Sequence, residues 1–284
     1  MKRFFLLFTA VLMLAHLVAC EFYTREEQLA MLRLNDDDFS HPSDLSVKQI
    51  IDAMQRANDP KKQFMNADRY ILKQKAISEK QVENRRTSQE YVTEIKFCEP
   101  DMIRWTHIRN NKPFQINICR GGSVWSVDPH SLKSKKLNEG LELNMFRTMI
   151  GLMNPQKTYL DVFKTVSVDK VFEEEKTCYR LICQAHDDEI PPYVVYVDAK
   201  TFLTMKVETI KYLGDGSQSM YISVPQEYTW YGDVLMPRVT SVSTSQGTDF
   251  SFITEFVINP NIPASDFELP KRFEINLNGE PTLK

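Results

Sequence analysis

The chain has 284 residues, of which 42% are hydrophobic and 26% are charged, and it contains only 9 glycines. This composition excludes collagen-like and disordered chains, and the length is sufficient for a sizeable hydrophobic core. The 38 acidic residues outnumber the 35 basic ones, which argues against nucleic acid as a partner because the phosphate backbone attracts cations.

The first residues have the pattern of an export signal. Lys2 and Arg3 precede an apolar run over residues 4–19 that contains no formally charged side chain. Such a start is typical of a secretory signal peptide, and the run is somewhat short of the roughly 20 apolar residues that a membrane-spanning helix needs. We therefore expect residues 1–19 to be a cleaved signal peptide that takes no part in the fold.

A cysteine follows the apolar run directly. The sequence Leu17-Val18-Ala19-Cys20 resembles a bacterial lipobox, which implies cleavage after Ala19 and acylation of Cys20 with palmitate-like chains. Several acyl chains on one residue anchor a protein stably, whereas a single chain holds it only marginally. Glu21 is not the aspartate of inner-membrane retention in enteric bacteria, which favours an outer-membrane address facing the periplasm. An ordinary signal peptide with an incidental cysteine and an uncleaved anchor are the alternatives.

The segment after the cysteine is polar, and we expect residues 20–44 to tether the lipid to the domain, with a short helix near residues 24–34. The acidic run at residues 36–38 lacks the spacing of a calcium-binding loop and is typical of a solvated linker.

A longer helix is predicted next, with a start at Ser43 or Asp44 and an end at Asp59-Pro60. Its apolar residues recur on one helical face, at Val47, Ile50, Ile51 and Met54. Residues 64–90 are rich in charge, and we expect one longer helix or two there.

From about residue 91 the apolar period changes to two. Short runs alternate with turn residues up to residue 127, which predicts an antiparallel meander. A helical period returns before Asn154-Pro155, and strand patterns then continue from about residue 166 to residue 258. We count about eleven strands, with helices before and among them.

Several strands carry large apolar groups on both faces, and only two or three helices are available to cover them. We therefore predict a mainly β (α+β) fold over residues 45–284, in which a curved antiparallel sheet forms an incomplete barrel covered by a few helices. Such an arrangement can leave an apolar cavity. We expect this ligand cavity to be lined by Ile103, Trp105, Trp125, Phe146, Met149, Ile150, Met153 and Phe252.

The internal helix carries Met145, Met149 and Met153 at a spacing of four residues. Methionine is flexible and polarisable and suits surfaces that receive apolar ligands of variable shape. One hypothesis is that these residues form a lid over a lipid-sized cavity. The alternative is that they are ordinary core residues of a helix packed onto the sheet.

Three stretches resemble the LolA-type lipoprotein carriers and their larger lipoprotein-sorting relatives. They are "EPDMIRWTHI" with "INICRGGSVWSVDP" (residues 99–108 and 116–129), "YVDAKTFLTMKVETIKYLGDG" (196–216) and "VINPNIPASDFELP" (257–270). The resemblance implies a half-barrel that holds acyl chains. Carriers of this family commonly have an arginine where this chain has Glu99, so their lid mechanism cannot be transferred. The lipid on Cys20 implies an anchored protein rather than a free shuttle.

The sequence offers little support for catalysis or for a cofactor. It lacks the HExxH and Gly-x-Ser-x-Gly motifs and both nucleotide-binding fingerprints. The best candidate for acid–base or metal chemistry is residues 186–189 (His-Asp-Asp-Glu), for which a solvated turn is the simpler interpretation. We expect no enzyme, no cofactor and no metal. The pairing of Cys98, Cys119, Cys178 and Cys183 stays open, and no two of them have zinc-site spacing.

The leading hypothesis is thus a non-enzymatic envelope lipoprotein that binds acyl chains of lipids or lipoproteins, for transfer or sorting toward the outer membrane. Its expected partners are the membrane, through the N-terminal lipid, and an envelope transport complex. One alternative is a periplasmic protein-binding or envelope-stress sensory module on the same fold. An anchored hydrolase acting through His107 or His186 is another.

Overall fold

The computed structural model describes residues 23–36, 40–82, 85–212, 217–270, 273–275 and 281–283. The predicted signal peptide and Cys20 lie outside these residues, and their assignment stays a prediction. Within the described part of the chain, one antiparallel sheet of fourteen strands dominates, and it does not close into a barrel. The prediction of a curved, incomplete barrel is confirmed.

The strands follow one another as hairpins, except that the last long strand pairs with the first. Strand β14 lies beside β2, so the order across the sheet is β1-β8-β9-β10-β11-β12-β13-β14-β2-β3-β4-β5-β6-β7. Their bounds are β1 Ser40–Pro42, β2 Arg69–Val82, β3 Arg85–Cys98, β4 Met102–Arg109, β5 Lys112–Arg120, β6 Ser123–Val127, β7 Ser134–Lys136, β8 Thr165–Glu173, β9 Lys176–Gln184, β10 Tyr193–Asp198, β11 Thr204–Tyr212, β12 Gln218–Tyr231, β13 Val234–Thr244 and β14 Gly247–Ile258.

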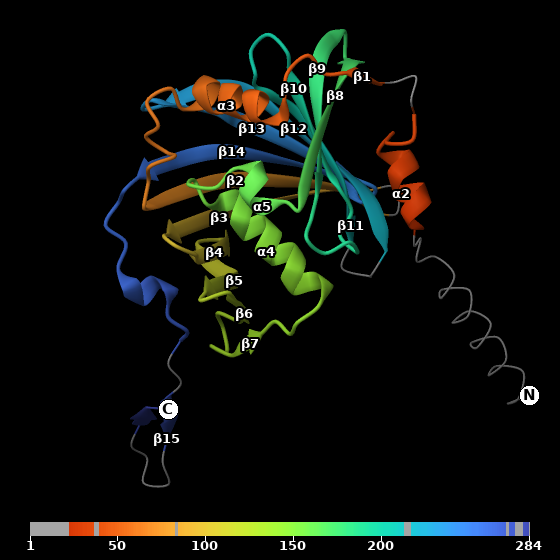
Figure 1. The fold of residues 1–284 in the computed structure, drawn as a ribbon. Coiled ribbons are helices and arrows are strands. Elements are labelled where there is room, and N and C mark those ends of the chain that lie inside the picture. The colour runs from red at the N-terminus through yellow and green to blue at the C-terminus, as the bar shows by residue number, and fades with distance from the viewer. Residues whose placement is uncertain are drawn as a thin grey trace, which may run out of the picture.

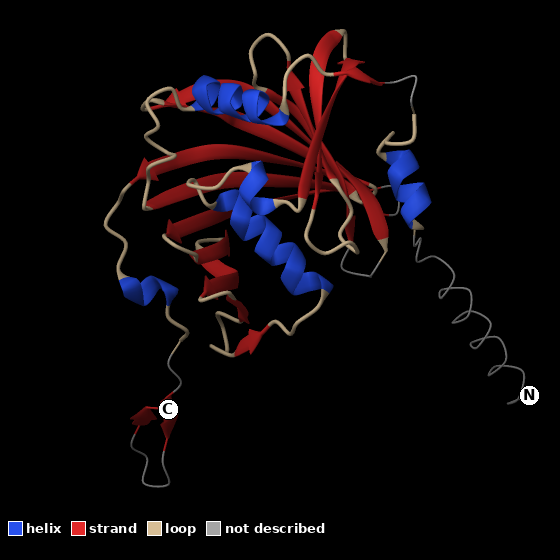
Figure 2. Cartoon of the chain, viewed as in Figure 1, coloured by secondary structure: helices blue, strands red, loops and turns tan. Residues whose placement is uncertain are grey.

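Three helices lie within the curve of the sheet, on what we call its inner face (Figures 1 and 2). They are α3 (Val47–Asn58), α4 (Leu141–Met153) and α5 (Tyr159–Val162). A fourth helix, α2 (Arg25–Met31), and a 3₁₀ turn, η2 (Ala264–Phe267), lie against the opposite, outer face. A separate hairpin of β15 (Phe273–Ile275) and β16 (Pro281–Leu283) follows.

Helix α3 begins two or three residues later than the sequence predicted. Its N-cap is Ser46, which forms a reciprocal capping box with Gln49, rather than Ser43 or Asp44. Its apolar face packs against β9 and β10 together with α5, in a core cluster that includes Ile50, Leu181 and Val195.

The prediction of helices over residues 64–90 is wrong, because residues 69–82 and 85–98 form the paired strands β2 and β3. The charged residues that suggested an exposed helix lie on the outer face and form cross-strand ion pairs. Lys73 Nζ lies 2.7 Å from a Glu255 carboxylate oxygen, and Lys75 Nζ lies 2.9 Å from one of Glu90. The fourteen-stranded sheet also contains β1 and β7, and the separate hairpin contains β15 and β16, none of which the sequence predicted.

The N-terminal segment packs against the domain from Tyr23 onward. Leu32 is 0% exposed in a cluster with apolar residues of β8, β9, β10 and β11 on the outer face. Gln28 Nε2 donates to Gln218 Oε1 over 3.2 Å, and Arg180 Nη1 donates to the Arg33 carbonyl over 2.9 Å. Residues 23–34, which fall within the predicted tether, are therefore packed against the sheet.

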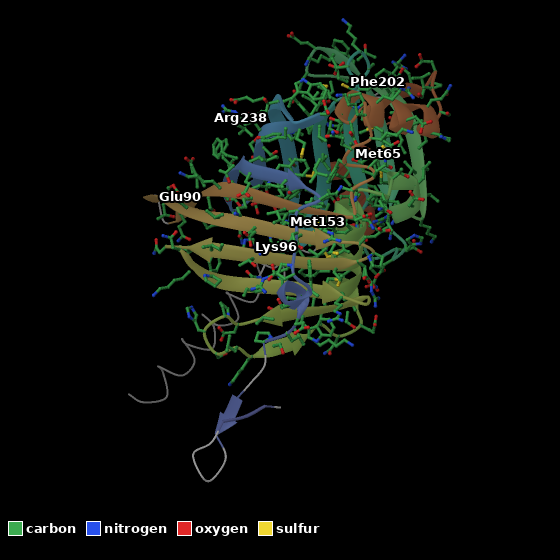
Figure 3. The ribbon with its side chains drawn as sticks, turned by 90° about the vertical axis from the view of Figure 1, so that its left-hand side faces the viewer. Met65, Glu90, Lys96, Met153, Phe202 and Arg238 are labelled. Carbon is green, nitrogen blue, oxygen red and sulfur yellow. The ribbon has the colours of Figure 1, made fainter. Side chains whose placement is uncertain are left out.

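The C-terminal segment covers another part of the outer face. Leu269 packs against a cluster of Ile116, Ile118 and Val127 on β5 and β6. Lys96 Nζ lies 2.8 Å from an Asp266 carboxylate oxygen, which fastens η2 to β3 (Figure 3). The two segments leave the inner face to α3, α4 and α5.

Candidate ligand-binding cavity

Helix α4 crosses the inner face of the β2–β6 half of the sheet, and its C-terminal end is fastened there (Figure 1). The Tyr70 hydroxyl donates to the Met153 carbonyl over 2.9 Å, and Asn154 Nδ2 donates to the Pro100 carbonyl over 3.1 Å. Because the last carbonyls of a helix lack partners within the helix, such bonds hold the end of α4 against the sheet.

Helix α5 holds α4 from the other side. A Cβ built on Gly151 would lie 3.1 Å from both γ-carbons of Val162. Glycine at this position therefore permits the two helices to approach closely.

A cavity of about 370 Å³ lies between α4 and the sheet. This volume falls within the range of roughly 300–1,000 Å³ that is typical of ligand pockets. One wall is apolar and comes from α4, and the opposite wall comes from β4, β5, β10, β11 and β12. The lining residues are Trp105, His107, Gln115, Asn117, Met145, Phe146, Met149, Leu152, Ile190, Tyr193, Thr209, Ile210, Lys211 and Tyr221.

The strand wall is more polar than the helix wall. The Lys211 ammonium lies 4.4 Å from the centre of the Tyr221 ring, a cation–π contact. Partial desolvation of the ammonium lowers the pKa of Lys211, and the negative charge of Asp249 partly opposes this effect. His107 Nδ1 lies 3.1 Å from Thr93 Oγ1, and burial lowers the pKa of His107, which favours the neutral ring.

A second cavity of about 480 Å³ adjoins the first. Both are lined by Leu152, Tyr193 and Tyr221, so the space continues along the inner face toward α3. Burial raises the pKa of Tyr159, which lines the second cavity, so its hydroxyl stays protonated. Leu152 on α4 borders both cavities, and its side chain is 41% exposed.

Six of the eight predicted lining residues come together at α4, but only three of them border the first cavity. Those three are Trp105, Phe146 and Met149. Ile103, Ile150 and Met153 border a space of only about 10 Å³, so they belong to a filled core with Phe97 and Val124. The cavity therefore lies nearer β11 and β12 than the sequence suggested.

The other two predicted lining residues do not border the described cavities. Trp125 pairs with Ile118, while its neighbour Val124 packs beneath α4, so Trp125 projects from the outer face. Phe252 pairs with Lys75, whose side chain lies on the outer face. A bulge between Ile253 and Glu255 reverses the alternation, which explains why Phe256 packs inward and Phe252 does not.

Sequence reasoning missed the strand wall of the cavity, above all Lys211, Tyr193 and Tyr221. A signal for Lys211 was present, because Val207, Thr209 and Lys211 alternate along β11 and the first two lie inward. A lysine in phase with inward positions is unusual, and it marks a polar site on an otherwise apolar face.

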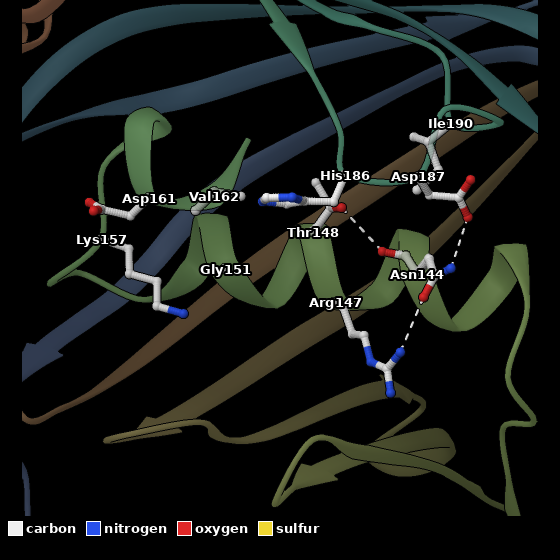
Figure 4. Close-up of a pocket in the computed structure, with 10 residues that line it drawn as sticks. All are labelled: Asn144, Arg147, Thr148, Gly151, Lys157, Asp161, Val162, His186, Asp187 and Ile190. Atoms are coloured by element: carbon white, nitrogen blue, oxygen red, sulfur yellow. Dashed lines mark hydrogen bonds between the residues drawn. The ribbon is translucent and has the colours of Figure 1, made fainter. Parts of the chain in front are cut away.

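A third pocket, of about 510 Å³, lies on the other side of α4 and is polar (Figure 4). It includes His186 and Asp187, the start of the charged turn. Asp187 accepts hydrogen bonds from Asn144 Nδ2 at 2.8 Å and from the Glu189 amide at 2.9 Å, and Asp188 pairs with Lys164. These contacts order the turn and join it to α4, so they give the two aspartates a structural role.

The four described cysteines are free, and three of them are buried, namely Cys119, Cys178 and Cys183. Burial raises the pKa of Cys119 and of Cys178 to about 11 and that of Cys183 to about 12, whereas nucleophilic thiols have a lowered pKa. In the described ranges, histidine, cysteine and acidic side chains form no group of three or more that could hold a metal ion. Nor is any helix there long and apolar enough to cross a membrane.

Comparison with solved structures assigns the fold. The chain resembles a LolA superfamily protein from Nitrosomonas europaea with a TM-score of 0.55 and 10% identity, over 79% of this chain and 98% of that one. It resembles a DUF1329 family protein from Desulfovibrio piger with a TM-score of 0.52 and 11% identity, over 78% and 97% of the two chains. A putative outer membrane lipoprotein-sorting protein domain from Vibrio parahaemolyticus has a TM-score of 0.49 and 13% identity to this chain, over 77% of this chain and 94% of that one.

No protein-family model matches the sequence, and a search of curated proteins finds no match. The likeness is thus one of fold, and the chain has the fold of LolA superfamily proteins.

Proposed function

We propose that this chain, with its LolA-like fold, is a lipid-anchored protein of the bacterial envelope that binds acyl chains between α4 and the sheet, without catalysis. The observation that carries the proposal is the pair of adjoining cavities, of about 370 and 480 Å³, on the inner face. Burial of a methylene group contributes about 0.8 kcal/mol, so a chain that buries ten of them gains roughly 8 kcal/mol before ordering costs.

The side chains that border this space suit a flexible apolar ligand. Met145 and Met149 adapt to chains of different shape, because methionine has three rotatable bonds and a polarisable sulfur. The exposed position of Leu152 between the two cavities gives an acyl chain a route along the inner face. The fold supports the same conclusion, because the LolA-type carriers hold acyl chains in a half-barrel.

The docked N-terminal segment supports action at a membrane surface. The Tyr23 amide donates to Gln218 Oε1 over 3.0 Å. Only Glu21 and Phe22 separate Tyr23 from Cys20, and three residue steps of chain span at most roughly 11 Å. An acylated Cys20 would therefore hold the domain close to the bilayer. We infer an anchored acceptor or lipid-handling protein, which transfers or sorts its ligand toward the outer membrane.

Extraction of the purified protein tests the proposal. The exported chain carrying Cys20→Ala, which removes the acylation site, is purified without detergent, extracted with organic solvent and examined by mass spectrometry. We expect an acyl-bearing molecule at a near-stoichiometric ratio to the protein. A protein preparation that contains no such molecule and binds no added acyl chain would contradict the proposal.

A matched pair of variants ties binding to the cavity. Leu152→Trp fills the space between the two cavities, whereas Leu160→Trp adds the same volume on α5, where the residue is 47% exposed and borders neither cavity. We expect Leu152→Trp to lower the acyl content at least tenfold and Leu160→Trp to leave it unchanged. Recovery of a stoichiometric protein partner without lipid would favour a sensory or protein-binding module instead.

A further inference from the structure

The first cavity has unpaired hydrogen-bond donors on its strand wall. The Trp105 indole Nε1 is buried and has no acceptor among the described residues. Lys211 is an exposed residue that lines the cavity. It forms no ion pair with any residue that the structure describes, and its ammonium contacts the Tyr221 ring. Buried polar groups are nearly always hydrogen-bonded, so the unpaired Trp105 indole calls for an explanation.

The cavity also lacks a negative charge to balance the lysine. Its lining includes Lys211 and His107 but neither aspartate nor glutamate. Asp249 is close enough to affect the pKa of Lys211, yet it is not part of the lining. The exposed side chain of Lys211 borders the cavity, so an anion bound there would accept a charge-assisted hydrogen bond from an ammonium group that has no carboxylate in the same lining.

The two walls present different chemistry to one ligand. The α4 wall consists of Met145, Phe146, Met149 and Leu152, and the strand wall carries Lys211 with the amides of Gln115 and Asn117. A molecule that satisfies both walls has an apolar chain and a compact group that accepts hydrogen bonds and carries negative charge.

We propose that the cavity selects an anionic amphiphile, in which an acyl or alkyl chain lies along α4 and a carboxylate or phosphate head pairs with Lys211. This inference rests on the proposed acyl-chain function and specifies the ligand class. The acyl groups of a lipid-modified N-terminal cysteine are joined through ester and amide bonds and carry no charge. Lys211 therefore favours free fatty acids and lipid phosphates over the acyl groups of lipoproteins.

The experiment compares ligands that differ only in the head group. Hexadecanoate, hexadecyl phosphate and hexadecanol, below their aggregation limits, are titrated at pH 7 into the delipidated Cys20→Ala chain, with isothermal calorimetry as the readout. A hydrogen bond to a charged group contributes more than a neutral one, and we expect either anion to bind about tenfold more tightly than the alcohol. Comparison of the two anions shows which head the site prefers.

Variants assign the preference to the lysine. Lys211→Gln is expected to reduce the preference for the anions to less than threefold without weakening hexadecanol binding, and Lys211→Arg is expected to retain it. Lys200→Gln, at an exposed turn position, is the matched control and should behave as the parent protein. A far-ultraviolet circular dichroism melt confirms that each variant is folded.

The outcomes separate this inference from the proposed function. If all three ligands bind and the parent protein does not distinguish them, or if Lys211→Gln keeps the full preference, the role of Lys211 is wrong while acyl-chain binding stands. If none of the ligands binds to the parent protein, the acyl-chain function itself is contradicted.

Discussion

The Tyr70 hydroxyl in β2 donates a hydrogen bond to the Met153 carbonyl at the end of α4, over 2.9 Å. Burial raises the pKa of Tyr70, so the hydroxyl keeps its proton and remains a donor. This bond joins the sheet to the helix that forms the apolar wall of the cavity. The space between the helix and the sheet is therefore narrow at the Met153 end of α4. It is wider toward Met149 and Met145.

Replacement Tyr70→Phe removes this donor and leaves the Met153 carbonyl without it. We expect the free energy of unfolding, measured by urea titration, to fall by about 1 kcal/mol. Amide hydrogen exchange in the last turn of α4 should also become faster. Tyr231→Phe is the control, because its hydroxyl lies 3.4 Å from the Ile253 carbonyl, a weaker bond. Equal losses in the two variants, with unchanged exchange in α4, would contradict the role of Tyr70.

The contact of Gly151 with Val162 predicts a coupled effect of two substitutions. Gly151→Ala improves helix propensity by about 1 kcal/mol, but its Cβ would crowd both γ-carbons of Val162, and overpacking typically costs about 1–3 kcal/mol. We expect Gly151→Ala to destabilise the parent protein and to stabilise the Val162→Ala variant. A double-mutant cycle in urea measures the coupling. The same effect of Gly151→Ala in both backgrounds would show that the helices do not press on each other there.

His107 predicts a dependence of stability on pH. Burial lowers its pKa below the ordinary value of 6.5, so the unfolded chain binds a proton more readily than the folded one. The contribution of neutral His107 to the free energy of unfolding is therefore fully present above pH 6.5. It is lost as the pH falls from 6.5 toward the pKa of His107 in the folded protein, by at most about 1.4 kcal/mol per pH unit. His107→Gln should remove this part of the loss between pH 7.5 and 5.5.

The control for His107 is the exposed His186. His186→Gln should leave the pH dependence of unfolding as it is in the parent protein. The ring proton signals of His107 in an NMR titration give its pKa directly, and a value at or above 6.5 would contradict the prediction.

Leu32 tests whether the N-terminal segment belongs to the folded domain. The side chain is fully buried against β8–β11, and Leu→Ala changes in such positions cost about 2–5 kcal/mol. We expect Leu32→Ala to lose stability in this range, whereas the exposed Asn35→Ala should change it by less than about 0.5 kcal/mol. A loss below 0.5 kcal/mol for Leu32→Ala would mean that residues 23–36 act as a loose tether.

Much of the fold was predictable because most strands expose one face and bury the other. The eleven predicted strands all occur, and the α4 face of Phe146, Ile150 and Met153 packs on the sheet as its period indicated. Strand β2 was missed because its outward positions hold lysines that pair with acids on β3 and β14. Such cross-strand pairs depend on which strands become neighbours, and the sequence pattern of β2 alone does not contain that information.

The cavity was predictable in kind but not in position. Phe252 was misplaced because the bulge after Ile253 changes the phase of β14, and a single extra residue leaves no strong mark on the sequence. Lys211 and Tyr221 lie on the neighbouring strands β11 and β12, where Tyr221 pairs with Thr209, and both border the cavity. They were missed because these strands lie far from α4 in the sequence. Only the curvature of the sheet brings these two strands opposite α4.

The most direct test of the central claim is a crystal structure of the Cys20→Ala chain loaded with 16-bromohexadecanoic acid. The bromine atom gives an anomalous signal that locates the end of the acyl chain without reference to a fitted ligand. We predict a bromine peak between α4 and the strand wall, among the residues that border the two cavities. A peak confined to the molecular surface, or an unoccupied inner face at saturating ligand, would contradict the account.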